Sequence, residues 1–154
     1  MQNSSTTPTG NNSVSPYLVV RDARALLEFV KKAFDAREKE ALSTPDGTMM
    51  HCEVVIGDSV IMIGTAPPDM EPTNSMIHIY TEDCDAMYKH AILAGAVSVQ
   101  EPRDQFYGDR NSGVADQFGN YWWIATHIED VSSEEIADRM AAMQQEQEKS
   151  GTDA

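Results

Sequence analysis

The amino-acid sequence predicts an α+β fold in which two tandem β-α-β-β-β units are followed by a C-terminal helix. Short apolar runs rich in β-branched residues alternate with amphipathic helical patterns, as such units require. Asp22 and Asp83 each precede a helical pattern and lie 61 positions apart. The turns at Gly57 and Gly119 each precede a strand and lie 62 positions apart. Because two independent landmarks share nearly one spacing, we infer an internal duplication whose two copies must cover each other's sheets.

The first unit spans residues 14–66. The run YLVV at 17–20 predicts a strand, and Asp22 then precedes a helical pattern whose apolar residues share one face. The runs EKEALST and MMHCEVVIG predict the next two strands, joined by the turn PDG at 45–47. The dipeptide GD at 57–58 then turns the chain into the last strand of the unit, SVIMIGT.

The second unit, residues 74–130, repeats this order. MIHIYTED predicts a strand, CDAMYKHAILAGA a helix, and VSVQEP, NSGVAD and NYWWIATH three further strands. A closing helix is expected over 131–146, begun by the capping box SSEE, with a narrow apolar stripe that packs on the body. This stripe consists of Ile136, Met140 and Met143. The polar stretches 1–13 and 147–154 are predicted to be disordered tails.

Composition limits the partners that the chain can have. With 154 residues, 41% of them hydrophobic, the chain is long enough for one domain with its own core. Lysine and arginine total 11 against 25 aspartates and glutamates, and the formal net charge of −14 repels nucleic-acid phosphates and anionic membranes. No apolar run approaches the roughly 20 residues that span a bilayer, and the N-terminus lacks a secretory signal, so we expect a cytoplasmic protein. Cys52 and Cys84 lack metal-knuckle spacing and are expected to be buried, reduced thiols.

Three stretches carry a family resemblance. YGDR (107–110), DQFGNYW (116–122) and HCEVVIGDSVIMIG (51–64), together with the paired units, resemble the vicinal oxygen chelate superfamily, in the glyoxalase/bleomycin-resistance-like branch often labelled PhnB-like. The resemblance covers about residues 15–128 and implies curved mixed sheets, with a helix on the outer face of each sheet and a ligand cavity on the concave face. It also implies a homodimer. The superfamily includes glyoxalase I, extradiol dioxygenases and proteins that only bind bleomycin, so the fold does not choose the function.

Strand alternation assigns residues to the two faces of these sheets. The expected helix-facing set is strongly apolar and consists of Leu18, Val20, Cys52, Val54, Ile56, Ile77, Ile79, Trp122 and Ile124. The expected cavity-facing set is more polar and more aromatic and consists of Ser15, Tyr17, His51, Glu53, Ile61, Ile63, Met76, His78, Tyr80, Trp123 and Ala125.

The resemblance also implies where a metal would bind. Metal-dependent members of the superfamily hold a divalent ion through four His or Glu ligands on the first and last strands of each unit. Counted from the landmarks, these positions are Ser15, Ile61 or Met62, Met76 and Trp123. None of these side chains binds a hard cation, so we expect no metal and no other cofactor there. His51, Glu53 and His78 remain as a displaced three-ligand site or as acid/base groups, with polar lining of a wet cavity as the simpler interpretation.

Two hypotheses about function stay open. The first is a metal-free small-molecule binding protein whose ligand contacts are Tyr17, Ile61, Met76, Tyr107, Arg110 and Trp123. Arg110 presents a planar guanidinium that binds carboxylate or phosphonate, or else forms a structural turn pair with Asp109 or Asp116. The alternative is a lyase-, isomerase- or dioxygenase-like enzyme that uses His51, Glu53 and His78.

Overall fold

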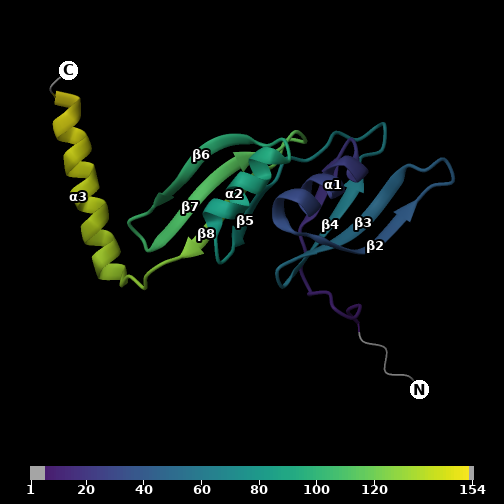
Figure 1. Cartoon of the computed structure of the whole chain (residues 1–154), viewed down its shortest axis with the longest axis horizontal. Coiled ribbons are helices and arrows are strands. Elements are labelled where there is room, and N and C mark those ends of the chain that lie inside the picture. Colours follow the sequence, from purple (N-terminus) through teal and green to yellow (C-terminus); the bar gives the residue numbers. More distant parts are fainter. Residues whose placement is uncertain (1–5, 153–154) are drawn as a thin grey trace.

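The computed structural model of the chain describes residues 6–152, and Figure 1 shows two strand-and-helix units side by side with a projecting C-terminal helix. The first unit consists of β1 (Tyr17–Val20), α1 (Ala23–Phe34), β2 (Arg37–Ser43), β3 (Met49–Ile56) and β4 (Ser59–Thr65). The second consists of β5 (Met76–Tyr80), α2 (Cys84–Leu93), β6 (Val97–Asp104), β7 (Asp109–Ala115) and β8 (Tyr121–His127). The last element is α3 (Ser133–Thr152). The predicted fold class is therefore confirmed.

Each unit forms its own four-stranded mixed sheet. The strand order is β1-β4-β3-β2 in the first sheet and β5-β8-β7-β6 in the second. In both sheets the first strand runs parallel to the last strand of its unit, while the remaining neighbours are antiparallel. In each unit the helix carries the chain from the first strand to the second strand at the opposite edge of the sheet, and the antiparallel strands then return to pair with the first. Helices α1 and α2 pack against each other, so the two units meet through their helical layers.

The duplication extends to the hydrogen bonds that begin the helices. Asp22 and Asp83 are the N-caps of α1 and α2, and each carboxylate accepts from the N–H three residues further on, at 3.1 and 3.0 Å. Thr65 near the end of β4 and Thr126 near the end of β8 each accept from the first N–H of their helix, at 3.2 and 2.9 Å. Both pairs are 61 positions apart, so the two units fasten strand to helix in the same way.

One core joins the two units. Trp122 on β8 is fully buried, and its ring lies 4.6 Å, centroid to centroid, from the ring of Phe34 at the end of α1. The indole N–H of Trp122 donates to Asp116 Oδ2 at 2.8 Å. Asp116 also accepts from the backbone N–H groups of Phe118 and Asn120, at 2.8 and 2.9 Å, which fixes the turn before β8. The predicted helix-facing residues all belong to this core or pack against it.

Two residues lie on the opposite face from the one predicted. Ile61 and Ile63 were expected to face the cavity, but they are 4% and 0% exposed and belong to the core beneath α1. The hairpin at Gly57 has a two-residue turn that pairs Ile56 with Ser59, so Ile61 pairs with Val54. Because cross-strand partners share a face, odd-numbered residues of β4 face the helix and Val60, Met62 and Gly64 face away from it.

Helix α3 departs from its prediction in length and in packing. It was expected to end at 146 but continues to Thr152, and it contains no buried residue. In Figure 1 it projects from the end of the second unit. Arg139 fastens its first turns by donating to the carbonyl of Phe106 at 3.0 Å and to Glu129 at 2.7 Å. The expected packing of its apolar stripe on the body is wrong, since Met140 and Met143 remain exposed.

Across the described residues, we find no helix whose length and apolar character would allow it to cross a membrane.

We expect Trp122→Ala to lower the free energy of unfolding by about 3–5 kcal/mol, because it leaves a large cavity between the units and removes the hydrogen bond to Asp116. Urea denaturation followed by circular dichroism measures the change. Tyr121→Ala is the matched control, since Tyr121 is the neighbouring aromatic residue and is 46% exposed, and it should cost less than about 1 kcal/mol. Equal losses in both variants would contradict this account of the core.

Candidate functional site

Most of the candidate site residues lie on the face of each sheet opposite its helix, which we call the open face. Among the residues that the structure describes, no helix or strand packs across either open face as α1 and α2 pack across the other side, and the segment before β1 reaches the first open face through Asn11. Large apolar side chains stay exposed there, including Tyr17 at 46%, Met76 at 67% and Tyr80 at 64%. Exposed apolar surface of this kind is typical of a binding site or of an interface.

A cavity of about 290 Å³ lies on the open face of the second sheet. Its lining consists of His78, Gln100, Gln105, Tyr107, Asn111 and Trp123. The ring of Trp123 lies over Gly113 on the neighbouring strand, where an added Cβ would stand 2.8 Å from a ring carbon. The absence of a side chain at Gly113 therefore lets the indole lie flat on the sheet and form one wall of the cavity.

A hydrogen-bond network centred on Asn111 forms the other wall. Asn111 is 6% exposed, and its Oδ1 accepts from the side-chain amides of Gln100 at 2.8 Å and Gln105 at 2.9 Å. Its Nδ2 donates to the hydroxyl of Tyr107 at 2.6 Å. Sequence reasoning missed Gln100, Gln105 and Asn111. The available signal was a polar residue two positions from Gly113, on the same face of a strand that is otherwise buried.

The open face of the first sheet carries a charged group instead. Glu53 is 7% exposed and accepts from Lys39 at 3.1 Å and from Asn11 at 3.2 Å. Burial alone would raise the pKa of Glu53, but the hydrogen bonds from Lys39 and Asn11 and the charge of Lys39 outweigh burial and lower that pKa. His51 lies beside it, and its Nδ1 is 2.9 Å from the hydroxyl of Tyr17. Glu53 is thus an ionised, paired carboxylate and a poor proton donor near neutral pH.

The structure does not bring the predicted trio together. His51 and Glu53 are on β3 of the first sheet, whereas His78 is on β5 of the second. The ring of His78 contacts the ring of Tyr80 at a tilt, with centroids 4.7 Å apart. Nowhere in residues 6–152 do three or more His, Cys, Asp or Glu side chains group in a way that could hold a metal ion. The displaced three-ligand site is therefore not assembled within one chain.

The residues on the family's metal-bearing strands do not fit a divalent ion either. On the open faces of β1, β4, β5 and β8, Tyr17 pairs with Met62 and His78 pairs with Trp123. Of these four side chains only His78 is an imidazole or a carboxylate. Of the predicted positions, Ser15 lies before β1 and Ile61 faces α1. Met76 and Trp123 are on the open face but carry a thioether and an indole.

Arg110 lies on the helix-facing side of β7, away from the cavity. Its Nε donates to both carboxylate oxygens of Asp85 on α2, at 3.1 and 3.2 Å, and its Nη1 donates to Asp104 on β6 at 3.0 Å. The structure thus places Arg110 away from the cavity that Trp123 lines. Its structural pairing is real, but the partners are Asp85 and Asp104 rather than Asp109 or Asp116.

A second cavity, of about 500 Å³, lies where the first unit meets the edge of β5. Phe34, the turn at Asp58 and Ile61 line one side of it, and His78, Tyr80 and Met87 line the other. Ile61 therefore reaches a cavity between the units rather than the predicted open face. The carbonyl of Ser75 and the N–H of Thr81 form hydrogen bonds with β8. Backbone direction alternates along a strand, so the N–H and C=O groups of Met76, His78 and Tyr80 point away from β8, toward the free edge of the sheet.

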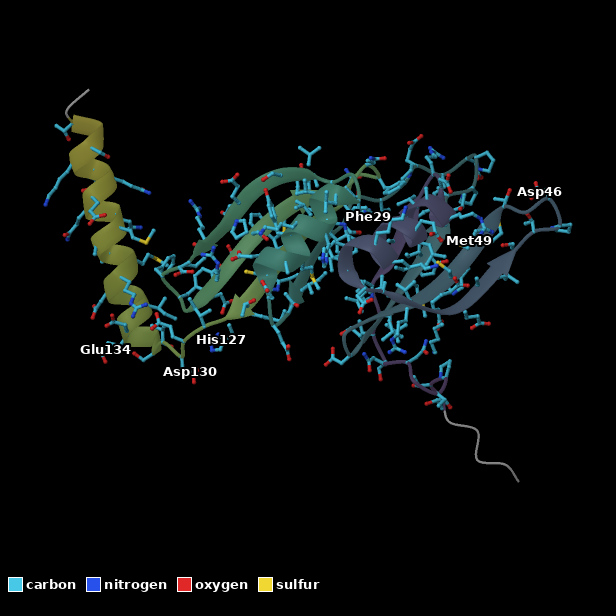
Figure 2. All side chains as sticks on the ribbon, viewed as in Figure 1. Phe29, Asp46, Met49, His127, Asp130 and Glu134 are labelled. Carbon is cyan, nitrogen blue, oxygen red and sulfur yellow. The ribbon has the colours of Figure 1, made fainter. Side chains whose placement is uncertain are left out.

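A third group of polar residues lies where β8 leads toward α3. Asp109 on β7 is 5% exposed and accepts from the hydroxyl of Tyr80 at 2.8 Å. Its other oxygen lies 2.8 Å from His127 Nδ1, and His127 Nε2 lies 2.7 Å from Asp130. Figure 2 shows His127 and Asp130 close together just before the helix begins. Hydrogen bonds to Asp109 and then Asp130 raise the pKa of His127, which therefore favours its charged form.

We expect the stabilising effect of His127 to fade as the pH rises. A group whose pKa is raised on folding stabilises the folded state fully below its unfolded pKa of about 6.5, and this contribution is lost as the pH passes the folded pKa. The difference in unfolding free energy between the parent and His127→Ala should therefore be larger at about pH 5.5 than at about pH 9. His90→Ala, an exposed change on α2, is the control. A difference that grows with pH would contradict the raised pKa.

Comparison with known proteins identifies relatives of this chain in sequence and in structure. Residues 12–124 match the family model described as the Glyoxalase/Bleomycin resistance protein/Dioxygenase superfamily. An uncharacterized protein of Mycobacterium bovis is 35% identical over 141 residues, which cover 84% of this chain and 93% of the relative. An uncharacterized protein of Mycobacterium tuberculosis is also 35% identical over 141 residues, covering 84% of this chain and 83% of that relative.

Solved structures share the fold at lower identity. TioX from a Micromonospora species aligns with a TM-score of 0.66 at 21% identity, covering 77% of this chain and all of TioX. The fosfomycin resistance protein FosX from Mesorhizobium loti aligns with a TM-score of 0.55 at 19% identity, covering 75% of this chain and 91% of FosX. The family match over most of the chain and the shared architecture agree, and the chain belongs to the glyoxalase/bleomycin resistance/dioxygenase superfamily.

Proposed function

We propose that this chain is a small-molecule binding protein of the glyoxalase/bleomycin-resistance type, from the PhnB-like branch, that acts in the cytoplasm without a metal at the family's usual site. The cavity on the second sheet carries the proposal. One wall is an indole lying flat over Gly113, and the other is a hydrogen-bonded amide network around a buried asparagine. An aromatic wall combined with a few fixed polar groups is the usual composition of a ligand pocket.

The two buried carboxylates of the open faces are already engaged. Glu53 is held by Lys39 and Asn11, and Asp109 is held by Tyr80 and His127. The cavity itself contains neither carboxylate nor guanidinium among its lining residues. His78 is the one imidazole in the lining. The pairings favour binding over catalysis because, among residues 6–152, they leave no free carboxylate beside His78 to act as its partner in proton transfer.

We also propose that the protein is a homodimer in which the open faces of two chains enclose the ligand. In one chain the open faces leave Tyr17, Met76 and Tyr80 exposed. The outer edge of β5 directs unpaired backbone groups into the cavity between the units, within the part of the chain that the structure describes. An exposed strand edge beside apolar surface is unfavourable in a monomer, and a second chain can cover both.

We expect Trp123→Ala to weaken the binding of aromatic ligands. Loss of the indole removes a stacking wall that contributes about 0.5–1.5 kcal/mol beyond the buried area. A thermal-shift screen of small aromatic compounds, followed by calorimetry on the hits, measures the effect. Tyr121→Ala is the control, because Tyr121 is on the same face of β8 but does not line the cavity. If every hit binds Trp123→Ala as tightly as the parent, the proposed site is wrong.

A thermal-shift assay also tests whether the protein binds a metal ion. Nickel, zinc, manganese or iron should barely raise the melting temperature, whereas a tight ligand at about 100 times its dissociation constant stabilises by roughly 2.7 kcal/mol. A large shift would contradict the metal-free proposal. If such a shift disappeared in both His51→Ala and His78→Ala, the metal-free proposal would give way to a displaced metal site formed from two chains.

Light scattering at micromolar concentration should give twice the chain mass of 17.0 kDa. Met76→Asp places a charge on the open face at the β5 edge and should shift the equilibrium toward the monomer, because burying an unpaired carboxylate is costly. Leu93→Asp is the matched control, since Leu93 is 85% exposed on α2 and away from the open faces. A parent protein that is monomeric at this concentration would remove the dimer proposal.

A further inference from the structure

The Asn111 network has one consistent orientation of its amide groups. Gln100 Nε2 lies 2.8 Å from Asn111 Oδ1 and 3.4 Å from the backbone carbonyl oxygen of Asn111. A backbone carbonyl can only accept, so this contact places the nitrogen of Gln100, and not its oxygen, toward Asn111. Asn111 Oδ1 must then be the acceptor for both glutamines, and Asn111 Nδ2 must be the donor to Tyr107.

This orientation determines which atoms the cavity presents to a ligand. The Oε1 atoms of Gln100 and Gln105 accept no hydrogen bond from any residue in 6–152, and both side chains are partly exposed in the lining of the cavity. The Tyr107 oxygen accepts from Asn111, so its own O–H remains to donate. Beside Trp123 the lining therefore offers two carbonyl acceptors, the hydroxyl donor of Tyr107 and the second N–H of Gln105.

The electrostatics of the cavity disfavour an anionic ligand. The six lining side chains include no Lys, Arg, Asp or Glu, and His78 is their one imidazole. On neighbouring open-face positions, Arg103 lies opposite Asn111 but is exposed and does not line the cavity, and Asp109 is occupied by Tyr80 and His127. The chain as a whole carries −14, which lowers the local concentration of anions.

We propose, building on the proposed binding function, that this cavity takes an uncharged, flat ligand that donates N–H or O–H groups along one edge. The donors meet Gln100 Oε1 and Gln105 Oε1, and the ring of the ligand stacks on the exposed face of Trp123. The volume of about 290 Å³ is near the lower limit for ligand pockets, which suits a fused two-ring compound such as a cyclic imide or lactam.

Three probes of one size test the ligand class by calorimetry on the full chain. Quinazoline-2,4-dione is uncharged and carries two N–H donors, its N,N′-dimethyl derivative has the same ring without donors, and naphthalene-1-carboxylate is flat and anionic. We expect the dione to bind about tenfold or more tightly than either of the others, because each hydrogen bond to an otherwise unpaired acceptor contributes a few-fold in affinity. Stacking alone would give the dione and its dimethyl derivative similar affinities.

Variants then test which residues recognise the N–H groups of the dione. Gln100→Met and Gln105→Met keep the length of the side chain but remove its carbonyl, so each should reduce the preference for the dione over its dimethyl derivative. Gln144→Met on exposed α3 is the matched control and should leave the preference unchanged. Thermal denaturation of each variant shows whether it is folded, and a Gln117→Met variant reports the effect of losing a glutamine amide that bonds elsewhere, to the carbonyl of Gly95.

The outcomes separate this inference from the function on which it rests. Equal binding of the dione and its dimethyl derivative, tightest binding of the carboxylate, or an unchanged preference in both glutamine variants would overturn the ligand class. If such probes still bound in a Trp123-dependent way, the proposed binding function would stand. Failure of all three probes to bind at about millimolar concentration also overturns the ligand class. The binding function itself falls only if the wider screen finds no compound whose affinity depends on Trp123.

Discussion

The packing of one unit's helix against the other unit's core determines most of what this protein can do. Phe34 at the end of α1 and Trp122 on β8 are in ring contact, and both are buried. Because α1 and α2 also pack on each other, the residues on the helix-facing side of both sheets are buried in one core. The open faces are then the surfaces on which polar and aromatic side chains can be placed without loss of stability. The proposed binding site lies on one of those faces.

The two units have the same arrangement of strands and helix but carry different side chains on their open faces. In each sheet an aromatic ring lies over a glycine of the neighbouring strand, Tyr17 over Gly64 and Trp123 over Gly113. Around Tyr17 the polar groups include the charged pair of Glu53 and Lys39, whereas around Trp123 the cavity lining is uncharged. Tyr17 is on the first strand of its unit and Trp123 on the last strand of the other, so the two rings do not occupy equivalent positions. The side chains around each ring decide whether that face carries an ion pair or a neutral cavity.

Much of the fold follows from local signals, and the site follows from them less well. The caps at Asp22 and Asp83, the hairpin turn at Gly57 and the period-two apolar pattern all act over a few residues, so they predict the elements and their order. Ile61 was placed on the wrong face because its position was counted from a family landmark, while the two-residue turn fixes the register independently. Arg110 shows a different limit, since Asp85 is 25 positions away and no short-range pattern reveals the pair.

The buried asparagine explains why the least predictable part of the site is also the most informative. An amide inside a sheet is stable when its donors and acceptors are satisfied, and Asn111 satisfies its own through Gln100, Gln105 and Tyr107. Those partners come from β6 and the loop that follows it, and they are ordinary polar residues in the sequence. Once they satisfy Asn111, their remaining hydrogen-bonding groups can point only outward. The buried residue thereby imposes a fixed pattern of acceptors and donors on the cavity, although it contributes no atom of its own to that pattern.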